Sequence, residues 1–91
     1  MYCFERWQIA DDIEEKMRAY INHGVPLGEF LRAVFENNLV EASGRADDKN
    51  QANLPAFAAY IYNHAPFECW GSKEKVDAWI ERRGLETNTR R

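Results

Sequence analysis

The sequence predicts an all-α domain, a compact bundle of four short helices. Apolar residues recur with the spacing of an α-helix in four separate stretches. No stretch alternates apolar and polar residues convincingly over four positions, so Tyr2 to Phe4 is at most a short extended segment. With 91 residues, 45% of them hydrophobic, the chain can bury one modest core. We expect one helical domain over residues 1–84 and a polar, frayed tail over 85–91.

The first predicted helix runs from about Ile9 to His23. Its acidic residues cluster in the opening turns, where the helix dipole favours them, and Gly24 stands where a left-handed residue closes a helix. One face of this helix is apolar, at offsets of 0, 4, 7 and 8: Ile13, Met17, Tyr20 and Ile21.

The second predicted helix begins near Val25 and Pro26, because proline fits a first helical turn. It would be the central helix of the domain, and Ser43–Gly44 would end or bend it. Its apolar stripe is broad and comprises Leu27, Phe30, Leu31, Val34, Phe35, Leu39 and Ala42.

The third and fourth predicted helices span residues 54–64 and 73–83. Asn53 is the expected N-cap of the third, and Pro66 stops it. Ser72 caps the fourth, and Gly84 ends it. Whether residues 46–52 add a further turn before the third helix is left open. The inner face of the fourth helix comprises Val76, Trp79 and Ile80.

The residues that could carry catalysis or bind a metal do not form a recognisable pattern. Cys3 and Cys69 are the two cysteines, and only His64 and Cys69 are close enough in sequence to resemble a pair of ligands. A nucleophile also needs a base and a third group that orients it, and no acid is specifically placed for that role. We therefore expect no enzyme activity, no cofactor and no metal.

The charges are distributed unevenly along the chain. Residues 1–48 carry ten acidic and five basic residues, and residues 49–91 carry five acidic and seven basic residues. Nucleic-acid binding usually requires concentrated Lys and Arg, so nucleic acid is a less favoured partner. No apolar run is long enough to span a membrane, and the first residues do not look like a secretory signal. We expect a cytoplasmic protein without membrane contact.

Several short motifs follow one another along the chain: Gly24-Val25-Pro26-Leu27-Gly28-Glu29-Phe30-Leu31-Arg32-Ala33-Val34, Glu36-Asn37-Asn38-Leu39, Ala46-Asp47, Tyr62-Asn63-His64-Ala65-Pro66 and Cys69-Trp70-Gly71-Ser72-Lys73-Glu74-Lys75-Val76. In this order they resemble a family of small proteins encoded in tailed-bacteriophage and prophage genomes, mostly accessory reading frames of unassigned function. The resemblance covers roughly residues 5–83 and implies a bacterial host cytoplasm, but it transfers no activity.

The polar middle of the chain, residues 36–50, is either a long solvated connection or the contact surface, because core packing gives no reason for such polarity there. The sequence and the resemblance together favour a non-enzymatic protein that binds and inhibits, or modulates, a host protein or complex, such as an anti-defence inhibitor of the anti-CRISPR type. The alternative is a phage regulatory or replication module that contacts nucleic acid. Self-association through exposed Tyr60, Phe67 or Trp70 is also open. The candidate partner-binding residues are Glu36, Asn37, Asn38, Asp47, Asp48, Tyr60, His64 and Trp70.

Overall fold

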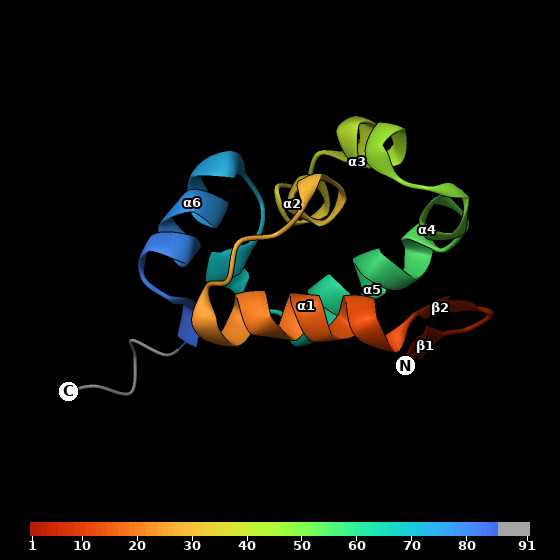
Figure 1. The fold of residues 1–91 in the computed structure, drawn as a ribbon, viewed down its shortest axis with the longest axis horizontal. Coiled ribbons are helices and arrows are strands. Elements are labelled where there is room, and N and C mark those ends of the chain that lie inside the picture. The colour runs from red at the N-terminus through yellow and green to blue at the C-terminus, as the bar shows by residue number, and fades with distance from the viewer. Residues whose placement is uncertain (86–91) are drawn as a thin grey trace.

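The computed structural model describes residues 1–85, which form six α-helices, one short 3-10 helix and a two-stranded antiparallel sheet. In Figure 1, α1 runs along one side of the molecule, with the β-hairpin at one of its ends and α6 near the other. In chain order the elements are β1 (Tyr2–Phe4), β2 (Trp7–Ile9), α1 (Asp11–His23), α2 (Glu29–Phe35), α3 (Leu39–Arg45), α4 (Asp48–Ala52), α5 (Leu54–His64), η1 (Phe67–Cys69) and α6 (Lys73–Glu81).

The prediction of a mainly α-helical domain is confirmed, but the prediction of four helices is wrong. Helices α1, α5 and α6 lie close to the expected positions. The Ser72 hydroxyl accepts a hydrogen bond from the backbone N–H of Lys75, as expected of an N-cap. The predicted tail lies outside the described residues, apart from Leu85.

The long central helix expected from Val25 to Ala42 is two helices. Helix α2 begins only at Glu29, and the chain turns at Asn37, which has a left-handed φ of 65°. Asn tolerates this conformation better than most residues. The side chain of Asn38 then caps α3 by accepting a hydrogen bond from the Glu41 N–H. This break directs α3 away from the axis of α2 and leaves Leu39 70% exposed.

The N-terminal segment is a β-hairpin, so the extended segment expected at residues 2–4 has a partner strand. Tyr2 pairs with Ile9, and Phe4 pairs with Trp7. The hairpin is fixed to the start of α5, because the Gln8 N–H donates to Asn53 Oδ1 at 2.9 Å. Asn53 stands at the N-cap position of α5 but makes no side-chain cap there. The segment left open before α5 contains the single-turn helix α4.

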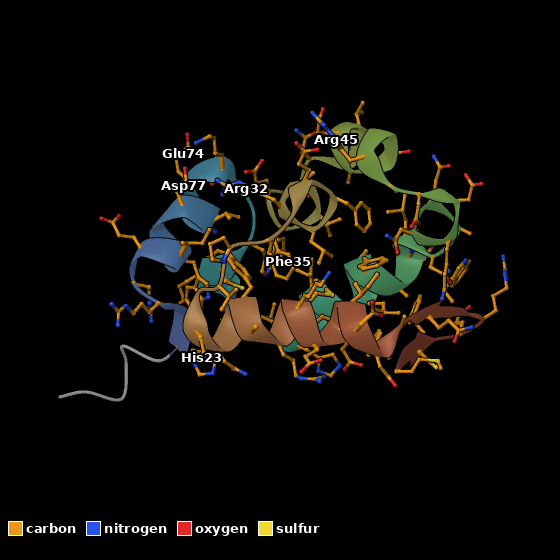
Figure 2. The ribbon with its side chains drawn as sticks, viewed as in Figure 1. His23, Arg32, Phe35, Arg45, Glu74 and Asp77 are labelled. Carbon is orange, nitrogen blue, oxygen red and sulfur yellow. The ribbon has the colours of Figure 1, made fainter. Side chains whose placement is uncertain are left out.

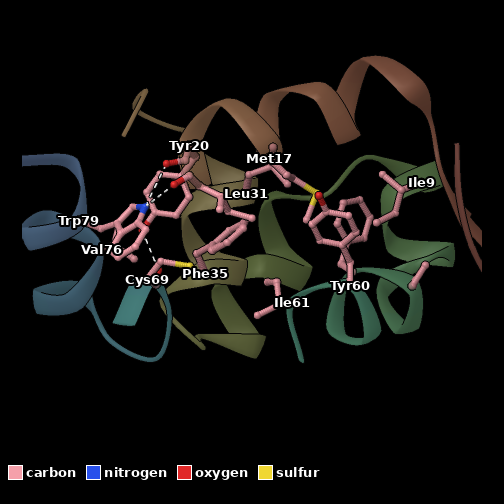
Figure 3. Close-up of a cluster of buried hydrophobic side chains, with 13 residues drawn as sticks. Ile9, Met17, Tyr20, Leu31, Phe35, Tyr60, Ile61, Cys69, Val76 and Trp79 are labelled. Atoms are coloured by element: carbon pink, nitrogen blue, oxygen red, sulfur yellow. Dashed lines mark hydrogen bonds between the residues drawn. The ribbon is translucent and has the colours of Figure 1, made fainter. Parts of the chain in front are cut away.

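One buried cluster joins α1, α2, α5 and α6. Its polar atoms are paired: the Tyr20 hydroxyl donates to the carbonyl of Cys69 at 2.7 Å. The Trp79 indole N–H donates to the carbonyls of Tyr20 and Ile21, at 3.1 and 3.2 Å. Figure 3 shows Tyr20, Cys69 and Trp79 gathered at one end of this core. These bonds tie the C-terminal end of α1 to α6 and to the segment before it.

Within residues 1–85, no helix has both the length and the apolar character that crossing a membrane requires.

Candidate functional site

A groove of about 780 Å³ lies between α3 and α5, and we call it the α3–α5 groove. Leu39 and Ala42 line it from α3, and Phe57, Ile61 and Tyr62 line it from α5. Phe4 of β1, the end of α2 and Trp70 complete the lining. The groove exists because the turn at Asn37 places α3 beside α5 without filling the space between them.

The lining of the α3–α5 groove carries no charged side chain. Its strongly polar members are three asparagines, Asn37, Asn38 and Asn63. Two of these are engaged within the chain: Asn38 caps α3, and the Asn63 side chain donates to the carbonyl of Ala59 at 2.9 Å. The groove therefore offers an apolar floor with amide groups in its lining.

Four large apolar side chains stand in or beside this groove with most of their surface exposed. Leu39 is 70% exposed and Tyr62 79%, and both line the groove. Val40, the next residue on α3, is 83% exposed. Phe67, 71% exposed, packs against the ring of Trp70 with the centroids 6.4 Å apart. Tyr62 and Phe67 together expose roughly 200–400 Å², which a partner protein could cover.

The structure brings three of the predicted contact residues to this groove and leaves the others elsewhere. Asn37, Asn38 and Trp70 belong to its lining. Trp70 is half-buried there and packs against the edge of the buried core. Asn37 and Asn38 have a structural role as well, because they form the turn between α2 and α3.

The acidic candidates have different surroundings. Glu36, at the C-cap position of α2, is paired with Arg32 of that helix at 2.6 Å. Asp47 caps α4 by accepting a hydrogen bond from the Asn50 N–H at 2.7 Å. Asp48 is exposed in the first turn of α4. None of the three lines the α3–α5 groove.

Tyr60 is not on the surface, and the expectation that it is exposed is wrong. Only 5% of it is exposed, and its ring meets Tyr2 edge-on with the centroids 5.1 Å apart. Burial raises the pKa of its hydroxyl. His64 is exposed and packs against both tyrosine rings, at centroid distances of 5.5 Å. This group holds the hairpin on α5.

The sequence did not single out Leu39, Val40 and Tyr62 as site residues. Leu39 continues the apolar spacing of the preceding helix, so the sequence predicts it in the core. The only signal against that expectation is the pair Asn37–Asn38, which can end one helix and cap the next.

The thiol of Cys69 is poorly suited to act as a nucleophile. It is fully buried, and burial raises its pKa to about 12. A thiol reacts as its thiolate, so a raised pKa lowers reactivity at neutral pH. Among the residues described, no three His, Cys, Asp or Glu side chains come together in an arrangement that could hold a metal ion. The absence of enzyme activity stays a prediction.

A second, smaller hollow of about 170 Å³ lies between α2 and α3 and is lined largely by charged residues that pair with one another. Arg45 bonds to Glu41 and to Glu29, both at 2.7 Å. In Figure 2, Arg45 stands on α3, while Arg32 lies near Asp77 between α2 and α6. The Arg45–Glu29 pair fastens α3 to α2, and the Arg32–Asp77 pair fastens α2 to α6.

Comparisons with protein-family models, with curated proteins and with solved structures give no match to this chain. The resemblance to phage accessory proteins therefore stays a prediction.

Proposed function

We propose that this chain is a non-enzymatic binding protein that docks a partner protein on the α3–α5 groove. The observation that carries the proposal is the exposure of Leu39 and Tyr62, 70% and 79%, in a groove whose lining is free of charge. Burying such side chains stabilises a complex by about 25 cal/mol for each Å² removed from water, before the costs of association. Exposed aromatic anchors in a hollow are also typical of interface hot spots.

The chemistry of the groove supports a protein partner over a nucleic acid. Phosphate groups are bound mainly by Lys and Arg, and neither lines the groove. One cation beside the groove is Lys75, whose ammonium group lies 3.8 Å from the ring centroid of Phe67, the neighbour of Trp70 in the lining. A single such cation does not form the charged track that a nucleic-acid backbone follows.

The resemblance to phage accessory proteins supports a more specific version of this proposal. The partner would be a bacterial host protein or complex, and binding would inhibit or modulate it. An anti-defence inhibitor of the anti-CRISPR type is one such protein. Asp48 and its acidic neighbours would then add attraction that weakens as salt rises.

The test is capture from a bacterial lysate, with and without nuclease, by the wild-type chain and two variants. Leu39→Asp places a charge in the groove at a helix-start position that tolerates Asp. Val25→Asp is the matched control, because Val25 is an exposed apolar residue, 47% exposed, that does not line the groove.

We expect wild type and Val25→Asp to retain the same protein after nuclease treatment, and Leu39→Asp to retain at least tenfold less. Circular dichroism and urea unfolding check that both variants are folded. Recovery of nucleic acid alone would favour the regulatory alternative. Equal capture by all three chains would exclude the groove as the docking site.

A further inference from the structure

We propose that residues 37–52, which comprise α3 and α4, form a strap that detaches from the rest of the domain and unfolds as a unit while the core stays folded. In Figure 1 this strap follows the outer edge of the molecule between α2 and α5. Its detachment removes one wall of the α3–α5 groove. The consequence for docking rests on the proposed function, whereas the movement itself does not.

The strap buries very little apolar surface. Among residues 37–52, all of which the structure describes, only Ala42 is buried. Helix α2, which has seven residues like α3, buries Leu31, Ala33 and Phe35. The free energy gained by burial grows with the apolar area removed from water, so one methyl group contributes little. The core therefore holds the strap much more weakly than it holds α2.

Both ends of the strap are anchored to folded elements. At the first end, the N–H of Asn38 donates to the carbonyl of Ala33 in α2 at 3.0 Å, and Asn37 has a left-handed φ of 65°. At the second end, Asn53 donates its side-chain amide to the carbonyl of Lys49 at 2.9 Å and accepts a hydrogen bond from the β-hairpin. Hinges usually lie at such element-terminal residues. The strap can therefore detach without releasing α2 or α5.

Away from these ends, the side-chain bonds of the strap mostly join it to itself. The Gln51 side chain donates to the Ser43 hydroxyl at 3.0 Å, which ties α4 to α3. Arg45 bonds to Glu41 on its own helix. Among the described residues, one further side-chain bond connects this part of the strap to the domain, from Arg45 to Glu29, whose side chains are 47% and 77% exposed. An exposed ion pair contributes little to stability, so α3 and α4 are bound to each other and only lightly to α2.

Neither helix of the strap persists after detachment. Helix α3 has seven residues and α4 has five. Isolated helices shorter than about 12–15 residues are marginal in water, because the first turn fixes several dihedral angles for one hydrogen bond. Gly44, within α3, lowers the helix propensity further. Detachment and loss of helix are therefore one event, which exposes the amides of both helices to exchange with solvent.

This movement makes one wall of the α3–α5 groove adjustable. Leu39 and Ala42 lie on the strap, whereas Phe57 and Ile61 on the opposite wall are buried in the core. A partner that contacts Leu39 binds only the attached state, so its apparent affinity falls with the fraction of chains in which the strap is detached. Changes in the stability of the strap would then tune docking without altering the contact residues.

Hydrogen exchange of the ¹⁵N-labelled full chain, followed by NMR at urea concentrations below the unfolding midpoint, tests the inference. We expect the hydrogen-bonded amides of α3 and α4 to share one opening equilibrium, about 100-fold more populated than the opening that exposes the amides of α5. Exchange from the strap should depend little on urea, because detachment exposes little surface, whereas exchange from α5 should depend on it strongly.

Two variants separate the strap from the core. Val76→Ala shortens a fully buried side chain of α6, and it should speed exchange from α5 by about fivefold or more while leaving α3 and α4 unchanged. Gly44→Ala should slow exchange from α3 and α4 by about two- to fivefold, because alanine favours the helix and its Cβ meets nothing within 4 Å.

A common opening free energy and urea dependence for the strap and α5 would overturn the inference. So would a Val76→Ala effect on α3 and α4 as large as that on α5. Unequal openings of α3 and α4 would show separate fraying in place of a unit and would also overturn it. None of these results removes the proposed docking, because a groove with a rigid wall can also bind a partner, and lysate capture with Leu39→Asp tests that separately.

Discussion

Gly24 and Gly84 meet backbone to backbone, so the end of α1 lies directly against the chain that leaves α6. A Cβ atom on Gly24 would lie 2.7 Å from the Cα of Arg83, and one on Gly84 would lie 2.6 Å from the carbonyl oxygen of Ile21. Both residues have left-handed φ values, 70° and 61°. This contact lies at the same end of the core as the hydrogen bonds that the Trp79 indole donates to the end of α1, and both hold α1 against α6.

Gly24→Ala should destabilise the domain by about 2–4 kcal/mol, because alanine adds left-handed strain and a clash with backbone that cannot easily move. The control is Gly44→Ala, which lies within α3 and meets nothing within 4 Å. That change should stabilise by about 0.5–1 kcal/mol. Urea unfolding measures both, and equal midpoints for the two variants would contradict the described contact.

Tyr20→Phe should cost about 1–2 kcal/mol, because it removes the buried hydroxyl that donates to the Cys69 carbonyl at 2.7 Å. Tyr62→Phe makes the same chemical change on a side chain that is 79% exposed, so its effect should stay within about 0.5 kcal/mol. Thermal unfolding of the pair separates the two environments. A Tyr62→Phe loss as large as that of Tyr20→Phe would show that the hydroxyl bond is not the cause.

Stability should fall as pH rises above about 9. Burial raises the pKa of the Cys69 thiol from its ordinary value of 9.0 to about 12, so the unfolded chain loses this proton at a lower pH than the folded chain. The stabilising contribution is therefore complete below pH 9 and is lost above it. Burial also raises the pKa of Tyr20, which adds to the fall above pH 10.

Cys69→Ala should reduce the loss of unfolding free energy between pH 8 and pH 10, whatever its cost at neutral pH. Cys3→Ala is the matched control, because Cys3 is exposed. Its loss over the same pH range should equal that of the wild type. Parallel pH profiles for the two variants would show that the Cys69 thiol is not responsible.

Arg32→Gln should loosen the contact between α2 and α6. Arg32 bonds to Glu36 on its own helix and to Asp77 on α6. The urea concentration at the unfolding midpoint should fall less than it does for Gly24→Ala. The charged side chains that Arg32 joins are partly exposed and screened by water, so their pairing contributes little. Lys73→Gln is the control, since Lys73 pairs with Asp77 of the same helix. A loss for Arg32→Gln no larger than that of the control would contradict a bridging role.

The contribution of the Arg32–Asp77 contact to stability should depend on pH in the acidic range. The pKa of Asp77 is lowered by its hydrogen bonds to Lys73 and Arg32. Its contribution is therefore present above pH 3.8 and is lost as pH falls below that value. The difference between Arg32→Gln and wild type should shrink in that range, and also in 1 M salt.

The helices that the sequence predicts well are those with their own stop signals. Gly24 ends α1, Pro66 follows α5, and Ser72 caps the start of α6. Each of these boundaries is determined by the residues that stand at it. The break between α2 and α3 is different, because the apolar spacing continues through it from Phe35 to Leu39. Periodicity cannot show that Asn37 takes a left-handed conformation, which depends on where α3 can pack.

The groove could not be derived from the sequence for the same reason. It depends on how far α3 stands from α5, a tertiary relationship without a local signal. Sequence reasoning nevertheless singled out Asn37, Asn38 and Trp70, because polarity in mid-chain and a bulky residue in a connection both need a reason. It missed Leu39, whose regular spacing indicated the core, although 70% of the residue is exposed.

The most direct test of the docking groove is a map of amide chemical shifts. The ¹⁵N-labelled chain is titrated with a peptide selected on the wild-type protein, and the changes are assigned to residues. We predict that the largest changes fall at residues 37–42 and 57–63 and at Trp70, and that they disappear in Leu39→Asp. Changes confined to the charged faces of α1 and α6, with these residues unaffected, would contradict the account.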